Sequence, residues 1–231
     1  MINISPKLNK AQLDCILNST LFTLWKNSFF KSGCNITKIN INGAVFFNDQ
    51  SIHSIFLEVY FSTPEGHSLT RSILLKGKSV VVIPLVYFNL ELIPKVLMVK
   101  QRRIYSGEFT IEFPSGKSEE GSTSSLNAQL ELLEECGVTV ALEEIKPLAQ
   151  SIIVCESAFD ESVDWFYCKI ASTELPIVNP SSILGNNLDG EFTYPTIATI
   201  DQLKNINSFQ IKTGLELLFE NNVLNPNDIN R

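Results

Sequence analysis

The chain has 231 residues, of which 44% are hydrophobic and 19% are charged, and its net charge is −7. This length and composition are typical of a soluble globular protein with one large domain, or with one domain and a small extension. The acidic balance argues against non-specific binding to nucleic acid, which needs a basic surface, and no apolar run approaches the ~20 residues that span a membrane.

The first third of the chain is predicted to form a small unit of helix and antiparallel sheet. Apolar residues recur at three- and four-residue steps over 11–31, which predicts one helix. Residues 36–47, 55–62 and 68–75 have the pattern of strands, and a P-E-G-H turn separates the last two. We therefore expect residues 1–78 to form an N-terminal helix and a small antiparallel sheet.

The remainder, residues 79–231, is predicted to be a second domain in which strands outnumber helices. A continuous apolar run at 80–86 suits a central strand. Further strands are expected at residues 95–101, 109–113, 145–154, 163–170 and 191–199, with a long polar loop at 172–190 and a closing helix at 200–220. This order favours an α+β sandwich with a mixed central sheet over a doubly wound parallel fold.

The five cysteines are scattered and show no C-x-x-C spacing. We expect buried free thiols in a reducing compartment, and neither a disulfide framework nor a zinc site. Because the first ten residues have no apolar signal core, the expected location is the cytoplasm.

An acidic helix precedes Gly137. At about 100° per residue, Glu131, Glu134 and Glu135 fall within one arc of its surface. Its leucines fall on a separate face that suits burial against a sheet: Leu126, Leu130 and Leu133. Three neighbouring carboxylates repel one another unless a cation lies between them, and magnesium binds carboxylates together with substrate phosphates. The pattern fits either a metal site for a phosphorylated ligand or a solvated acidic face with a glycine cap.

The stretch from Gly116 to Val138 resembles the Nudix box, G-x5-E-x7-R-E-U-x-E-E-x-G-U, in which U is a bulky aliphatic residue. The glycines and the three glutamates of the helix stand in register. Two positions depart from the motif, because Ser122 replaces its first glutamate and Leu130 replaces its arginine. In the family these two side chains often pair and hold the loop against the helix.

The flanking motifs are similar to those of the ADP-ribose and ADP-sugar pyrophosphatase branch of the Nudix superfamily, in particular the plant-type enzymes. K-Q-R-R at 100–103 resembles K-Q-x-R, and I-E-F-P-S-G at 111–116 resembles I-E-x-P-A-G. S-A-F-D-E-S at 157–162 and D-G-E-F at 189–192 resemble later loops of the branch. The resemblance implies a Nudix α/β/α sandwich with a mixed central sheet, and an N-terminal part that helps to form a homodimer.

By the same resemblance, the protein would hydrolyse a nucleoside diphosphate sugar, such as ADP-ribose or ADP-glucose, to a nucleoside monophosphate and a sugar phosphate. Magnesium, or manganese in its place, would be the cofactor. The implied roles are metal binding by Glu131, Glu135 and the Ser115 carbonyl, with help from Glu134; diphosphate binding by Arg103; contact near the nucleotide by Glu112; and activation of water by Glu191, or less readily by Asp189 or Glu161.

Other interpretations stay open. Arg103 could pair with a surface carboxylate, Glu112 could face water, Glu191 could be an ordinary acid at a strand edge, and Arg102 is interpreted as solvated or structural. Ser122 and Leu130 also allow a Nudix-fold protein that binds a nucleotide without hydrolysing it. A third alternative is a Nudix enzyme for another nucleoside diphosphate substrate.

Overall fold

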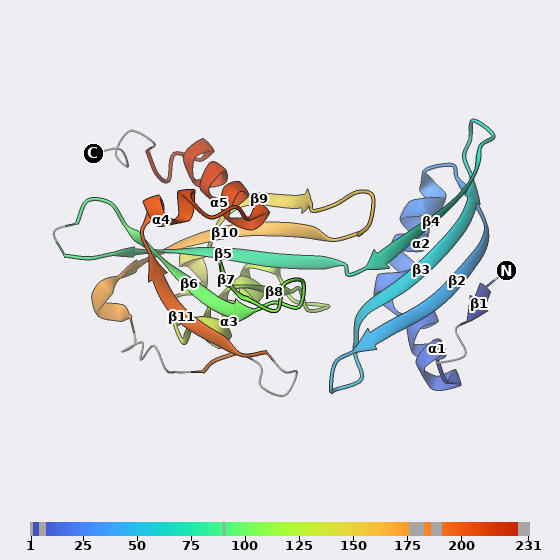
Figure 1. The fold of residues 1–231 in the computed structure, drawn as a ribbon, viewed down its shortest axis with the longest axis horizontal. Coiled ribbons are helices and arrows are strands. Elements are labelled where there is room, and N and C mark those ends of the chain that lie inside the picture. Colours follow the sequence, from blue (N-terminus) through green and yellow to red (C-terminus); the bar gives the residue numbers. More distant parts are fainter. Residues whose placement is uncertain (1, 5–7, 90, 176–182, 186–190, 226–231) are drawn as a thin grey trace. The chain divides into compact units, whose positions relative to one another are not determined.

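The computed structural model describes residues 2–4, 8–89, 91–175, 183–185 and 191–225 (Figure 1). The chain divides into two compact units. The first consists of Met1–Lys78 and Ile153–Ser162, and the second consists of Ser79–Ile152 and Val163–Arg231.

The first unit is a sheet of four strands with two helices. The strands are β1 (Ile2–Ile4), β2 (Asn35–Phe46), β3 (Ile52–Ser62) and β4 (Ser68–Leu75), adjacent in that order. β1 runs parallel to β2, and β2, β3 and β4 form an antiparallel meander. Residues of the two helices, such as Ile16 and Phe22, share a buried core with Ile39 and Leu57 of the sheet.

The single helix predicted over residues 11–31 is wrong at one point, because Ser19 separates α1 (Lys10–Asn18) from α2 (Thr20–Lys31). The backbone of Ser19 is extended, and its hydroxyl accepts a hydrogen bond from the Phe22 N–H at 3.2 Å. Serine competes in this way with the continuing helix and starts a new one as an N-cap. The apolar spacing continues across the break, which is why the pattern did not reveal it.

The second unit contains a sheet of seven strands. The main path is β11 (Thr193–Ala198), β6 (Lys95–Arg102), β5 (Lys78–Tyr87), β10 (Ser162–Ala171) and β9 (Lys146–Ile153). β7 (Phe109–Glu112) pairs with β6, and β8 (Ser115–Lys117) pairs with β5. β11, β6 and β5 are antiparallel neighbours, whereas β5 and β10 run in the same direction in Figure 1. The predicted mixed sheet is therefore confirmed.

Helices cover both faces of this sheet. Val82 of β5 packs in one core with Ala128 and Leu132 of α3 (Ser124–Cys136). Its neighbour Ile83 points to the other face and contacts the backbone of α5 (Phe209–Glu220) at Gly214. Successive strand residues point to opposite faces, so α3 and α5 lie on opposite sides of the sheet. The arrangement is the predicted α/β/α sandwich.

Three smaller features complete the second unit. The helix predicted over 200–220 is two helices, α4 (Ile200–Lys204), which starts in a capping box at Thr199, and α5. Two short 3-10 helices span Leu142–Glu144 and Ser172–Glu174. Within the described part of the chain, no helix is long and apolar enough to cross a membrane.

The prediction of buried thiols holds for two of the five cysteines. Cys136 and Cys168 are buried in the core between α3 and the sheet, whereas Cys15 is exposed and the other two are partly exposed. All five are free thiols.

Candidate functional site

α3 buries one acidic position and exposes its predicted apolar face. Leu126, Leu130 and Leu133 are 37%, 37% and 43% exposed, so the prediction that they pack against the sheet is wrong. Ala128, Leu132 and Cys136 face the sheet instead, and Glu135 beside them is only 4% exposed. The helix is therefore turned so that the glutamates at 131 and 135, one turn apart, approach β8.

The ends of α3 are fixed locally. Thr123 is the N-cap, and its hydroxyl accepts a hydrogen bond from the Leu126 N–H at 3.3 Å. Gly137 closes the other end in a left-handed conformation with φ 68°, which glycine adopts without strain. These two residues fix where the helix starts and ends, and the end at Gly137 is the one that the sequence predicted.

β8 contacts the carboxylates of both Glu131 and Glu135. The Ser115 N–H donates to Glu135 Oε2 at 2.8 Å. At the next residue, Gly116, an added Cβ would overlap the carboxylate of Glu131, so only glycine leaves room for that side chain in this position. Ser115 is fixed in turn, because its hydroxyl accepts from Gln210 Nε2 of α5 at 3.3 Å.

The carboxylates at 131 and 135 are held close to other negative charges. Burial, together with the charges of Glu134, Glu191 and Glu119, raises the pKa of Glu131 to about 8. Burial and the charges of Glu131 and Glu191 raise the pKa of Glu135, the Ser115 N–H and Arg103 lower it, and the resulting pKa is about 8. Without a compensating cation, Glu131 and Glu135 therefore retain their protons at pH values well above those at which carboxyl groups ordinarily ionise.

Arg103 and Glu112 form a two-bond ion pair beside this cluster. Arg103 Nε donates to Glu112 Oε1 at 2.9 Å, and Nη2 donates to Oε2 at 2.7 Å. Burial raises the pKa of Glu112, but hydrogen bonds from Arg103 and Thr110 outweigh burial and lower it overall. The pKa of Arg103 is raised, first by the bond to Glu112 and then by the charges of Glu135 and Glu191. Arg103 is thus the cation of the cluster, and its partner is Glu112, within the site.

Strand pairing explains why distant residues of the sequence meet here. In the β11–β6 register, Thr193 lies opposite Gln101, which places Glu191 near the level of Arg103. The Thr193 hydroxyl donates to the Glu135 carbonyl at 3.3 Å and ties β11 to α3. Glu191 acts electrostatically on Glu131, Glu135 and Arg103. The second unit therefore brings together all seven residues predicted for the site: Arg103, Glu112, Ser115, Glu131, Glu134, Glu135 and Glu191.

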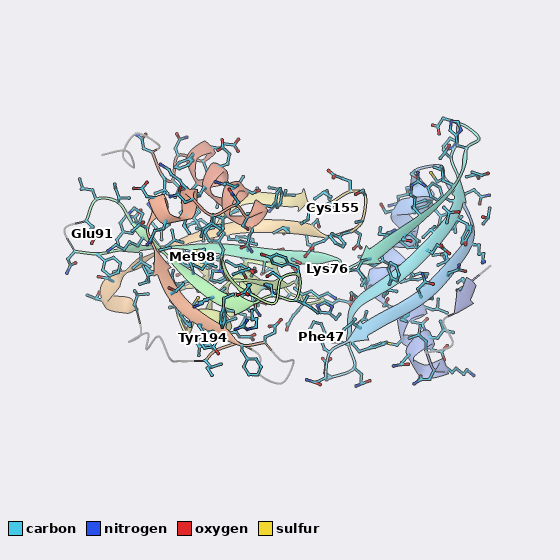
Figure 2. The ribbon with its side chains drawn as sticks, in the orientation of Figure 1. Phe47, Lys76, Glu91, Met98, Cys155 and Tyr194 are labelled. Atoms are coloured by element: carbon cyan, nitrogen blue, oxygen red, sulfur yellow. The ribbon has the colours of Figure 1, made fainter. Side chains whose placement is uncertain are left out.

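Glu134 differs from its neighbours because its side chain is exposed, although its charge still raises the pKa of Glu131. The sequence also offered two alternatives to Glu191. Glu161 belongs to the first unit, where it accepts from Lys76 Nζ at 2.8 Å (Lys76 is labelled in Figure 2). Asp189 lies outside the described residues.

The donor atoms suit a hard divalent cation. Within the described residues, no three acidic, histidine or cysteine side chains converge as a ready metal cage. Magnesium does not need one, because it binds through one or two carboxylates and keeps water or substrate oxygens as its other ligands. Carboxylates whose pKa is raised by burial and by neighbouring negative charges are a fit for such an ion, since a cation would offset both the burial and the repulsion.

The residues that hold the site residues in place through hydrogen bonds were not identified from the sequence. Thr110 donates to Glu112, Gln210 contacts Ser115, and Thr193 joins β11 to the helix. These residues come from three elements far apart in the sequence and carry no motif. The strand register of β7 and β11 against β6 was the signal that could have found Thr110 and Thr193.

No family model matches the chain, and no curated protein matches it. Among solved structures, the chain is similar to one described as "Crystal structure of ADP compounds hydrolase", with a TM-score of 0.56 and 13% sequence identity. The similarity covers 81% of this chain and 92% of that chain. At this identity the likeness shows a shared fold, of the Nudix type that the motifs predicted.

Proposed function

We propose that this protein is a magnesium-dependent hydrolase of the ADP-sugar diphosphatase type. It would cleave the diphosphate bond of a nucleoside diphosphate sugar, such as ADP-ribose or ADP-glucose, to a nucleoside monophosphate and a sugar phosphate. One observation carries the proposal: Glu131 and Glu135 are held against β8 with pKa values raised by burial and by neighbouring carboxylates, beside the partly buried cation Arg103. The fold shared with an ADP compounds hydrolase is consistent with this chemistry.

The cation would be held by Glu131, Glu135 and the Ser115 carbonyl, with Glu134 assisting from the exposed side. A bound magnesium or manganese ion supplies charge neutralisation of the diphosphate and lowers the pKa of a coordinated water. Ser115 contributes through its backbone on both sides: its N–H already orients Glu135, and its carbonyl is the proposed ligand.

Arg103 would bind the diphosphate. Two of its N–H groups are engaged by Glu112, which fixes the plane of the guanidinium and leaves its remaining donors for a phosphate oxygen. Glu112, held by Arg103 and Thr110, would contact the nucleotide half.

Glu191 would position the attacking water and take its proton. The water oxygen forms the new bond to phosphorus, and the bridging oxygen of the anhydride leaves with the other phosphate. Glu191 suits this role because its charge acts on Glu131 and Glu135, the residues proposed to hold the metal ion.

A second candidate function is nucleotide binding without hydrolysis. It is favoured by the two departures from the box: the Ser122 hydroxyl donates to the adjacent Thr123 carbonyl at 3.4 Å, and Leu130 is partly exposed, so no glutamate–arginine pair ties the loop to the helix at these positions. A Nudix enzyme for a different nucleoside diphosphate substrate is the other alternative.

The deciding experiment measures nucleoside monophosphate release from ADP-ribose, ADP-glucose and other nucleoside diphosphate sugars, with magnesium and with a chelator. We expect magnesium-dependent release from at least one of them, and a loss of about 100-fold or more in Glu135→Gln, because the ligand can no longer carry charge. Glu143→Gln, an exposed glutamate of the first 3-10 helix, is the matched control. Activity that survives chelation, or Glu135→Gln at full activity, would refute the metal assignment; binding without release would support the second candidate.

We also propose a homodimer in which the N-terminal sheet contributes to the partner's site. The resemblance of the chain to ADP-sugar pyrophosphatases supports it. Sedimentation at micromolar concentration should give twice the chain mass of 25.8 kDa. A monomer that is fully active would contradict both the assembly and the shared site.

A further inference from the structure

β6 carries basic residues on both of its faces. Gln101 and Arg103 lie on the face that meets the carboxylate cluster, since Thr193, opposite Gln101, contacts α3. Lys100 and Arg102 therefore point to the other face. There, Tyr194 lies opposite Lys100 and Phe109 lies opposite Arg102.

The Phe109 ring makes cation–π contacts with both Lys100 and Arg102. Lys100 Nζ lies 4.6 Å from the centroid of the Phe109 ring, and the guanidinium carbon of Arg102 lies 4.3 Å from it. Tyr194, labelled in Figure 2, meets the Phe109 ring edge-on with the centroids 5.8 Å apart. Arg102 also donates a hydrogen bond to the Gly107 carbonyl. The Arg102 guanidinium is therefore held in place and is not a freely solvated side chain.

Neither cation is neutralised. Arg103 is paired with Glu112, but among the described residues neither Lys100 nor Arg102 forms an ion pair. In the described structure, these two positive charges form a local site of opposite sign on a chain with a net charge of −7.

A pocket lies beside Arg102 and Arg103. It has a volume of about 340 Å³ and is lined by Gln101, Arg102, Arg103, Ile104, Gly107 and Phe192. Gln101 is 7% exposed, and its Oε1 has no hydrogen-bond partner in the described structure. A buried acceptor of this kind favours a ligand that brings a donor, because an unsatisfied polar atom is costly. The pocket thus offers an anion site, an acceptor and the aromatic surface of Phe192.

We propose that this pocket binds an additional phosphate group, carried on the ribose of the substrate's nucleotide half and outside the bond that is cleaved. Arg102, supported by the charge of Lys100, binds the phosphate. Gln101 Oε1 accepts from the neighbouring ribose hydroxyl, and Phe192 contacts the nucleoside. The inference rests on the proposed hydrolase function for its substrate class, but the anion site itself can be tested without catalysis.

The first test is calorimetric binding in chelator, with adenosine 5′-monophosphate, adenosine 2′,5′-bisphosphate and adenosine 3′,5′-bisphosphate as the probes. We expect one of the two bisphosphates to bind about tenfold more tightly than the monophosphate, as one or two charge-assisted hydrogen bonds would give. Arg102→Gln should remove this preference and leave binding of the monophosphate unchanged within about twofold.

Lys95→Gln is the matched control. Lys95 Nζ also lies 4.6 Å from an aromatic ring, that of Phe88, but it is paired with Glu91 at 3.1 Å and does not line this pocket. Lys95→Gln removes one positive charge from the same unit, as Arg102→Gln does. The Lys95→Gln variant should therefore still bind the bisphosphate more tightly than the monophosphate. Equal binding of all three nucleotides to the unmodified protein would overturn the proposal, as would an unchanged preference in Arg102→Gln.

Inorganic phosphate distinguishes a substrate group from a free ion. If phosphate binds in an Arg102-dependent way while the bisphosphates show no preference, the site serves a free anion and the substrate assignment is wrong. Hydrolysis is then compared for ADP-ribose and its 2′-phosphate, where the proposal expects a lower KM for the phosphorylated compound, lost in Arg102→Gln. If the binding preference is present but neither compound is hydrolysed, the hydrolase function fails and the phosphate site stands.

Discussion

Two faces of α3 depart from the usual distribution, in which charged side chains are exposed and apolar side chains are buried. On the face toward β8, Glu135 is buried and Glu131 lies against the glycine backbone at 116. On another face, Leu130 and Leu133 remain more than a third exposed. Burying carboxylates costs free energy unless hydrogen bonds or a cation compensate. The contrast teaches that the orientation of α3 is set by the site as well as by the apolar core.

The largest effect should come from adjacent leucines on different faces. Leu132→Ala removes a fully buried side chain from the core and should lower the free energy of unfolding by about 2–5 kcal/mol. Leu133→Ala, one residue later and 43% exposed, should change it by about 0.5 kcal/mol or less. Urea denaturation of both variants measures the difference. Equal losses would mean that the exposed face of α3 is covered in solution.

A smaller effect is expected from the glycine against which Glu131 packs. Gly116→Ala places a methyl group where the carboxylate lies, so the side chain must move. A displacement of about an ångström should cost about 100-fold in kcat/KM, with a weaker response to magnesium. Gly43→Ala is the control, because no atom lies within 4 Å of the added Cβ. Unchanged kinetics in Gly116→Ala would show that the position of Glu131 does not matter for the reaction.

The buried face should also make the metal-free protein sensitive to pH. The pKa values of Glu131 and Glu135 are about 8, against an ordinary value of 4.5. Between these values the unfolded chain has lost protons that the folded protein retains, so the free energy of unfolding falls as pH rises from about 5 to 8. Glu135→Gln should flatten this decline in thermal denaturation with chelator. Added magnesium should stabilise the unmodified protein more at pH 8 than at pH 6, since the ion must displace fewer protons. A decline that is equally steep in Glu135→Gln would contradict the assigned pKa.

The smallest effect concerns the positions where the chain departs from the box. The double substitution of Ser122→Glu and Leu130→Arg would create an ion pair on a partly exposed surface, worth only ~0–1 kcal/mol in stability. If hydrolysis is already efficient, the rate should change by less than about threefold, because Thr123 and Gly116 already fix the loop. A rise of about 100-fold would instead show that the loss of this pair impairs the natural enzyme.

Much of this structure was determined locally and could be read from the sequence. The apolar run at 80–86 is the buried centre of β5, and β4 spans the expected Ser68–Leu75. The spacing of Glu131 and Glu135 by one helical turn places them on one side of α3, and Gly137 ends the helix as predicted. These features depend on periodicity and on backbone preference, which neighbouring residues determine.

The errors arose where local patterns allow more than one outcome. Ser19 interrupts a continuous apolar stripe, since a hydroxyl that caps a new helix leaves the spacing unchanged. The same spacing identifies an apolar face of α3, but it does not say which face meets the sheet.

Only the tertiary structure decided how the parts of the site meet. Antiparallel pairing of β11 and β7 with β6 brings Glu191 and Thr110 to the level of Gln101 and Arg103, and Glu112 opposite Val99, although some of these residues lie up to 90 positions apart. It also turns Arg103 toward a carboxylate and its neighbour Arg102 toward Phe109. The sequence by itself determined which groups could bind a cation and a phosphate. Register and helix orientation decided which of them are buried, and desolvation by that burial is what raises the pKa of Glu131 and Glu135.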